Sequence, residues 1–140
     1  MRASLIGKGS CSRVAEPLFM LDSNICIYVL EALAEKLRPR IEACAPGQLV
    51  ASAISHAEVW RGVELNDPIA VGKVKRLYEI VNVVPFDEQA ARRYVEIAFK
   101  RHRFDRLIAA HALALDLTLI TNNEADFADV PGLRVENWTV

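Results

Sequence analysis

The feature that most constrains this 140-residue chain is the alternation of two kinds of apolar pattern along it. Short apolar runs predict β-strands, and longer segments with apolar residues three or four apart predict amphipathic helices. Strands that alternate with helices favour a parallel sheet covered by helices on both faces. The strands are expected at residues 18–21, 49–54, 81–86, 117–121 and 133–135.

The expected helices carry start and stop signals of their own. Ser55 and Glu58 have the spacing of a capping box, and Asp87 is placed to cap another helix. Pro39 is expected to interrupt the first helical stretch. The predicted helical segments are residues 25–44, a helix opening at Ser55, residues 69–80, 87–100 and 104–115, and a single turn at 123–127.

Residues 18–140 contain no internal repeat or linker, so we expect a single three-layer α/β/α domain with a mainly parallel sheet. Residues 1–17 lack the apolar core of a signal peptide and are expected to form a flexible N-terminal tail. No run approaches the ~20 apolar residues that a membrane helix needs. Three widely spaced cysteines without a C-x-x-C pair indicate reduced thiols in the cytoplasm rather than a disulfide or zinc framework.

The net charge of −1 gives the chain no overall attraction to nucleic acid, so any such binding requires a local basic patch. One candidate surrounds Asp105 in the segment KRHRFDR, residues 100–106. A solvated helix end and a rim that contacts phosphates explain this segment equally well. In the second interpretation the substrate rim consists of Lys100, Arg101, Arg103 and Arg106.

Polar side chains follow three of the predicted strands at the point where each strand ends. Asp22 follows the first strand, Glu58 the second, and Asn123 with Asp126 the fourth. Asp105 begins the helix that leads back into the fourth strand. Because open parallel sheets bind ligands beyond the carboxyl ends of their strands, we expect all five residues to lie on one edge.

Taken alone, each of these residues is better explained as a helix cap than as part of a functional site. The set is different, because neighbouring carboxylates repel one another unless a cation lies among them. Oxygen ligands without His or Cys select Mg²⁺ or Mn²⁺, and such a site suits hydrolysis of phosphodiester bonds. His111 lies on the predicted helix 104–115. We interpret it as a buried, hydrogen-bonded histidine rather than a catalytic base.

Four ordered segments resemble the motifs of PIN-domain ribonucleases, and especially those of the VapC toxins of VapBC toxin–antitoxin pairs. They are FMLDSNICIY (residues 19–28), SHAEVWRG (55–62), FDRLIAAHAL (104–113) and TNNEADF (121–127). The closing segment VPGLRVENW (130–138) is similar to the same group. The resemblance extends over about residues 19–140.

The resemblance implies an endoribonuclease that depends on Mg²⁺ or Mn²⁺ and acts on RNA. It implies a VapB-like antitoxin as partner, a homodimer, and a heterotetramer or larger assembly with the antitoxin. It also implies that Asp22, Glu58 and Asp105 bind the metal. Asn123 occupies the place of a fourth Asp found in many relatives, and we expect Asp126 to assist catalysis while Asn123 caps the turn.

Two other functions remain open from the sequence. Asn123 is compatible with a non-catalytic PIN-like module that binds RNA or protein, although the three other acids argue against it. A phosphotransfer domain with Asp22 as nucleophile would need a Lys after the last strand, and residues 136–140 contain none. The RNA target and the identity of the antitoxin are not determined by these motifs.

Overall fold

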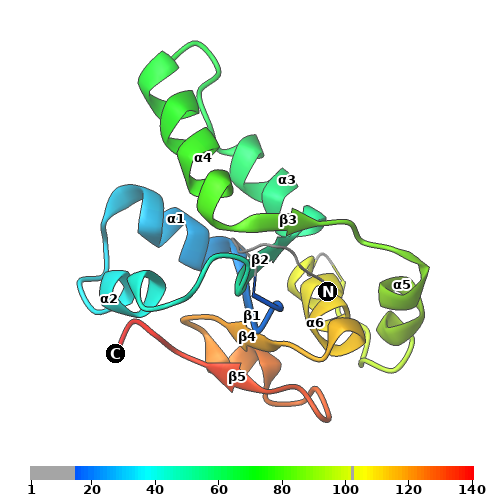
Figure 1. Ribbon diagram of the computed structural model, residues 1–140. Coiled ribbons are helices and arrows are strands. Elements are labelled where there is room, and N and C mark those ends of the chain that lie inside the picture. Colours follow the sequence, from blue (N-terminus) through cyan, green and yellow to red (C-terminus); the bar gives the residue numbers. More distant parts are fainter. Residues whose placement is uncertain (1–14, 102) are drawn as a thin grey trace, which may run out of the picture.

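The computed structural model describes residues 15–101 and 103–140 and contains a five-stranded sheet flanked by helices (Figure 1). All neighbouring strands pair in parallel, in the order β3-β2-β1-β4-β5. The predicted three-layer α/β/α class is therefore confirmed. The strands are β1 (Phe19–Leu21), β2 (Leu49–Ser52), β3 (Asn82–Val84), β4 (Thr118–Ile120) and β5 (Val135–Glu136).

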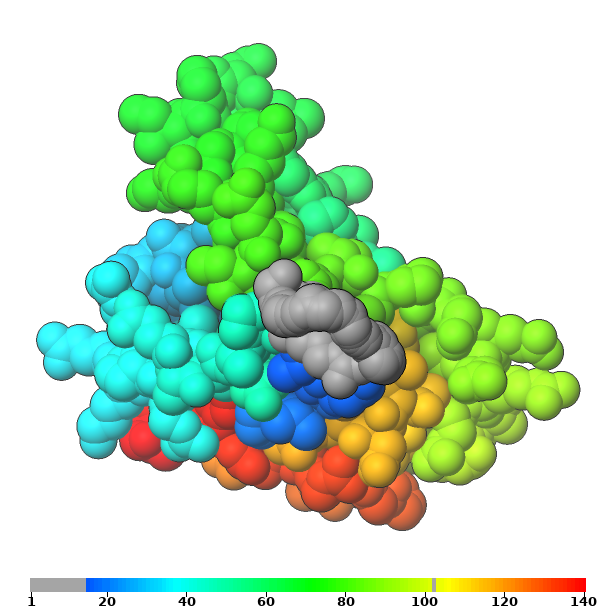
Figure 2. Space-filling view, viewed as in Figure 1, coloured from blue at the N-terminus to red at the C-terminus, as the bar shows by residue number. Residues whose placement is uncertain are grey.

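Pairs of helices connect the first four strands, and a short 3₁₀ helix leads to the last. The helices are α1 (Ser23–Glu31), α2 (Leu37–Glu42), α3 (Ala53–Arg61), α4 (Pro68–Ile80), α5 (Glu88–Tyr94) and α6 (Asp105–Leu115), with η1 (Glu124–Phe127) as the 3₁₀ helix. The end of α3 and the start of α4 project away from the sheet (Figure 1). In the space-filling view, this pair of helices stands out from the rest of the protein (Figure 2). No helix in the described part of the chain is long and apolar enough to cross a membrane.

The core has two parts, one on each face of the sheet. Leu21 and Ile120 pack with α1–α4 on one face, whereas Met20 and Leu119 pack with α6 on the other. Neighbouring residues of one strand thus point to opposite faces, as the pleat of a strand requires. Burial on both faces explains why these strands have continuous apolar sequences.

The first helical stretch is interrupted as predicted, but the break lies before Pro39, between α1 and α2. Helix α1 has its C-cap at Ala32, which adopts a left-handed conformation with φ 54°. Pro39 lies in the first turn of α2, where its missing N–H removes no hydrogen bond within the helix.

The predicted capping box at Ser55 and Glu58 is also wrong, because β2 ends earlier than expected and α3 begins at Ala53. Ser52 is the cap, and its Oγ accepts a hydrogen bond from the Ile54 N–H at 3.1 Å. Ser55 is buried within the helix, where its hydroxyl donates to the Ser52 carbonyl oxygen at 3.0 Å.

Two further boundaries differ from the prediction. Asp87 caps α5 as expected, but the helix ends at Tyr94 instead of continuing to residue 100. Val95 and Phe99 beyond it are 84% and 72% exposed, so the core offers these apolar side chains no support for further turns. The predicted tail falls mostly on residues 1–14, which lie outside the described residues; Ala15 donates its N–H to the Pro46 carbonyl oxygen at 2.9 Å.

Candidate active site

The ends of β1, β2 and β4 meet at one edge of the sheet, at the point where the strand order reverses. β1 lies between β2 and β4, and the chain passes from β1 to one side and later returns on the other. Such a reversal leaves a crevice beyond the strand ends. A pocket lies there, and its lining includes all five predicted site residues, Asp22, Glu58, Asp105, Asn123 and Asp126, together with Ser23, Asn24, Arg103, Phe104 and Phe127.

Asp22 lies at the end of β1 and is also the N-cap of α1. One carboxylate oxygen accepts the Ser23 N–H at 2.8 Å, and the other accepts the Thr121 hydroxyl at 2.9 Å. The residue is only 8% exposed. Burial raises the pKa of Asp22, the two hydrogen bonds oppose that rise, and the charges of Glu58 and Asp105 add to it. Asp22 therefore caps α1 and lines the pocket at the same time.

Glu58 reaches the pocket from the middle of α3 and accepts a hydrogen bond from the Ser23 hydroxyl at 2.5 Å. Ser23 begins α1, so this bond joins the helices that follow β1 and β2. The side chain that the sequence suggested as half of a capping box is thus turned towards Asp22 and its neighbours.

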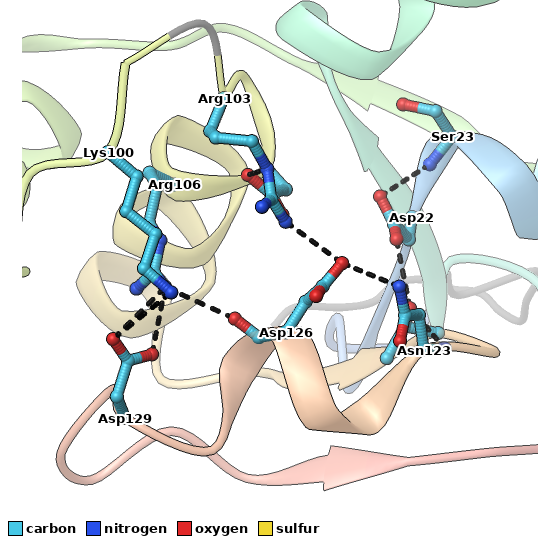
Figure 3. Close-up of polar contacts among 10 residues, drawn as sticks. Asp22, Ser23, Lys100, Arg103, Arg106, Asn123, Asp126 and Asp129 are labelled. Atoms are coloured by element: carbon cyan, nitrogen blue, oxygen red, sulfur yellow. Dashed lines mark hydrogen bonds and ion pairs between the residues drawn. The ribbon is translucent and has the colours of Figure 1, made fainter.

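Asp105 and Asp126 share one guanidinium group, that of Arg103. Figure 3 shows its contact with Asp126. Arg103 donates through Nε to Asp105 Oδ1 at 3.2 Å and through Nη2 to Asp105 Oδ2 at 2.5 Å. The same Nη2 lies 2.9 Å from Asp126 Oδ2. These pairings raise the pKa of Arg103, with the hydrogen bond to Asp105 as the largest cause. Arg103 thereby links Asp105, at the start of α6, to Asp126 on η1.

The predicted cap at Asn123 is wrong. Its side chain makes no capping hydrogen bond to the backbone of η1 but donates through Nδ2 to Asp126 Oδ2 at 2.5 Å. The Asn123 N–H donates instead to the Thr121 hydroxyl oxygen at 3.1 Å. Thr121 is completely buried and orients both Asp22 and the η1 turn. Sequence analysis missed this residue, although its position directly after β4 was the available signal.

Arg106 does not belong to the predicted substrate rim, because its side chain is fully buried. Its Nη2 donates to the Asp126 carbonyl oxygen at 3.2 Å and to both carboxylate oxygens of Asp129 at 2.9 and 3.1 Å. At the surface, Lys100 Nζ lies 3.7 Å from Asp129 Oδ2 (Figure 3). Lys100 and Arg101 are exposed, whereas Arg103 lines the pocket itself.

His111 is buried and lies outside the pocket lining. Its Nδ1 is 2.8 Å from the hydroxyl of Ser52, and the ring packs edge-on against Phe86. Burial lowers its pKa, which favours the neutral ring. The interpretation of His111 as a hydrogen-bonded core residue is therefore confirmed.

The donor set of the pocket suits a hard divalent cation. Its four carboxylates, Asp22, Glu58, Asp105 and Asp126, face one cationic side chain among the described residues of the lining, Arg103. Oxygen donors with excess negative charge are the ligands that Mg²⁺ and Mn²⁺ prefer. In this conformation, however, no group of three or more acidic, His or Cys side chains among the described residues is arranged to hold an ion. The predicted ligands Asp22, Glu58 and Asp105 thus share a pocket without forming a closed coordination shell.

Comparison with known proteins identifies the class to which this fold and pocket belong. The PIN domain family matches residues 19–133, and the chain belongs to that family. Among its relatives, the tRNA(fMet)-specific endonuclease VapC of Salmonella typhimurium is 31% identical over 132 residues, which cover 86% of this chain and 97% of that protein. Ribonuclease VapC1 of Haemophilus influenzae is 32% identical over 132 residues, covering 87% and 98%.

Solved structures agree with the sequence relatives. The crystal structure of DNA-bound VapBC from Salmonella typhimurium contains a chain with a TM-score of 0.78 and 28% identity, covering 87% of this chain and 98% of that one. The resemblance to VapC ribonucleases is therefore confirmed. So are the predictions of a PIN-like fold and of an endoribonuclease of the toxin–antitoxin type.

Proposed function

We propose that this chain is the toxin of a type II toxin–antitoxin pair and hydrolyses RNA phosphodiester bonds with Mg²⁺ or Mn²⁺ at the Asp22 pocket. The observation that carries the proposal is the gathering of four carboxylates from separate elements in one pocket lined by a single cationic side chain. Carboxylates in such surroundings are costly for the fold unless a cation offsets their charge. The membership in the PIN-domain family supports the same chemistry.

The residues have distinct roles in this proposal. Asp22 and Asp105 bind the cation directly, and Glu58 binds it or orients the attacking water. Ser23 and Thr121 hold Asp22 and Glu58 in position through the hydrogen bonds described above. Asp126 assists through a water molecule. The divalent cation supplies Lewis-acid stabilisation of the charge that develops at the phosphate.

The exposed cations near the pocket are the proposed contacts for the RNA backbone. Lys100 and Arg101 are exposed in the segment before α6, and Arg103 extends from the same segment into the lining. Phosphate contacts of this kind position a nucleic acid without reading its sequence. Because one relative is named for its action on tRNA(fMet), initiator tRNA is the first substrate to test.

We also propose that a VapB-like antitoxin inhibits the chain in the cytoplasm, and that the toxin forms a homodimer that assembles with antitoxin into a heterotetramer or a larger complex. The VapBC complexes among the structural neighbours support this assembly. The expected result is a toxin that elutes as a dimer in multi-angle light scattering and forms a larger complex with the product of the adjacent gene. A toxin that stays monomeric at high micromolar concentration and ignores that product would contradict the proposed assembly.

The activity is tested with purified chain, end-labelled initiator tRNA and an elongator tRNA. Asp22→Asn and Asp105→Asn should abolish cleavage while leaving the thermal unfolding transition cooperative. Asp116→Asn is the matched control, because Asp116 ends α6 at the surface and pairs only with Arg134 among the described residues. Cleavage should stop in excess EDTA and return with added Mg²⁺. Undiminished cleavage in either site variant, or in EDTA, would refute the proposal.

A further inference from the structure

In the part of the chain that the structure describes, Arg103 is the only cationic side chain in the lining of a pocket that also contains four carboxylates. It lies two residues before Asp105 in sequence, yet its guanidinium also reaches Asp126 on η1. Its side chain is 35% exposed, compared with 17% for Asp105 and 36% for Asp126. The three groups therefore form a partly buried ion-pair cluster in the lining of the pocket.

The geometry of this cluster has a direct consequence for the carboxylates. The fork of Arg103 donates to both oxygens of Asp105 and also approaches Oδ2 of Asp126, which additionally accepts from Asn123. Bidentate pairing of arginine with a carboxylate fixes both oxygens in one plane. Asp105 is consequently turned towards Arg103, and no set of three acids among the described residues is arranged around a shared ion.

We propose that Arg103 is an internal counter-cation that holds Asp105 and Asp126 until a divalent ion enters the pocket, and that metal binding displaces it. The inference rests on the proposed function, because it assumes that Asp105 takes part in metal binding. Arg103 neutralises part of the carboxylate charge without metal and thereby stabilises the empty site. The same contacts compete with the metal and weaken its binding.

A direct test follows the Arg103 side chain during metal binding. The Nε–Hε groups of the full-length chain, labelled with ¹⁵N-arginine, are observed by NMR during titration with Mg²⁺. The Arg103 signal is identified by its absence from the spectrum of Arg103→Lys. It should shift and exchange faster with solvent as Mg²⁺ saturates the site, because its acceptor, Asp105, has turned to the ion. The signal of Arg38, which pairs with Glu42 at the surface, should stay in place.

The second test measures metal affinity by calorimetry, independently of RNA cleavage. Arg103→Gln should bind Mn²⁺ about tenfold more tightly than the wild type, since a competing charge beside two carboxylates has been removed. The Mn²⁺ affinity of Arg103→Lys should lie between those of the wild type and Arg103→Gln, because Lys keeps the charge but lacks the planar guanidinium group. Arg38→Gln removes a more exposed ion pair on α2, outside the pocket lining, and should leave the affinity unchanged.

The outcomes separate this inference from the proposed function. If the wild type binds metal but Arg103→Gln binds it equally or more weakly, or if the Arg103 signal is unmoved at saturation, the inference is wrong and the proposed function stands. If neither the wild type nor Arg103→Gln binds Mg²⁺ or Mn²⁺, both are wrong. Should Arg103→Gln fail to fold, the NMR titration of the wild type and the affinity of Arg103→Lys decide the question.

Discussion

At the scale of single residues, the position of Asp22 depends on Thr121. The Thr121 hydroxyl donates to Asp22 Oδ2 and accepts the N–H of Asn123, so one buried side chain joins the end of β1 to the turn after β4. Groups that orient a metal ligand in this way commonly affect metal affinity or activity by 10–100-fold.

Replacing Thr121 by Val should therefore reduce RNA cleavage by about tenfold or more, because the shape of the side chain is kept while the hydroxyl is lost. Thr121→Ser should retain most of the activity. Thr118→Val is the matched control at the opposite end of β4, where the Thr118 hydroxyl has only a 3.4 Å contact with Arg134. Initial cleavage rates at several Mg²⁺ concentrations measure the effect, and equal rates for Thr121→Val and wild type would contradict it.

A second prediction at this scale concerns acid stability. Burial lowers the pKa of His111, so the unfolded chain takes up a proton at higher pH than the folded chain does. The stability that neutral His111 contributes is complete above its unfolded pKa of about 6.5 and is lost as the pH falls through its lower folded value. Urea unfolding at pH 7.5, 6.5 and 5.5 should show a steeper loss for the wild type than for His111→Gln. Equal slopes would exclude His111 as the cause.

At the scale of elements, Ser52 connects the helical layers on the two faces of the sheet. Its hydroxyl caps α3 and lies against His111 on α6, although α3 and α6 belong to opposite layers. A change at Ser52 therefore acts on two helices at once.

Ser52→Ala should lower the free energy of unfolding by about 2 kcal/mol, from the lost cap and from a buried His111 nitrogen left unpaired. Asp67→Ala, which removes the cap of α4 at an exposed position, provides a comparison and should lose about 1 kcal/mol. Chemical denaturation measures both. A loss for Ser52→Ala no larger than that for Asp67→Ala would show that the contact with His111 contributes nothing.

Arg106 connects α6 to the segment after β4 in a similar way, because its guanidinium binds the Asp126 carbonyl and the Asp129 carboxylate. Arg106→Met should lower the free energy of unfolding by about 2 kcal/mol, since Asp129 keeps only its 3.7 Å pair with Lys100 and η1 loses its attachment to α6. Arg134→Met, which breaks an exposed ion pair with Asp116, should lose under about 1 kcal/mol. Equal losses in the two variants would show that burial of Arg106 adds no stability.

At the scale of the whole molecule, the parallel sheet brings carboxylates from distant parts of the chain to one edge. Folding thus gathers like charges that the unfolded chain keeps apart, and a bound cation should stabilise the folded state. With Mg²⁺ at one hundred times its dissociation constant the gain is about 2.7 kcal/mol. For a chain of this length the melting temperature should rise by about 5–10 °C.

Differential scanning calorimetry with and without Mg²⁺ measures this rise. Asp22→Asn should abolish most of it, and Asp116→Asn should keep it. Binding to the folded pocket must raise the melting temperature once Mg²⁺ exceeds its dissociation constant. It would be contradicted if the wild-type melting temperature stayed constant up to roughly 20 times the Mg²⁺ concentration needed for cleavage.

The local sequence pattern predicts the layers of the fold and the carboxylates that gather at the pocket. Alternating strand and helix patterns are local properties, and they sufficed to predict the parallel sheet because the central strands β1, β2 and β4 are buried on both faces. Asp22, Glu58, Asp105 and Asp126 were predicted for a related reason: residues that follow parallel strands, or that begin a helix leading back into one, share one edge of the sheet.

The tertiary structure alone decided which partner each polar side chain takes. Arg103 and Arg106 look equivalent in the segment KRHRFDR, yet one enters the pocket and the other is buried against residues 20 and 23 positions away. Ser52, rather than the predicted Ser55, caps α3. Thr121 donates to Asp22 only because β1 and β4 are neighbours in the sheet. Hydrogen bonds and ion pairs act over a few ångströms, so they depend on the packing of distant segments rather than on local pattern.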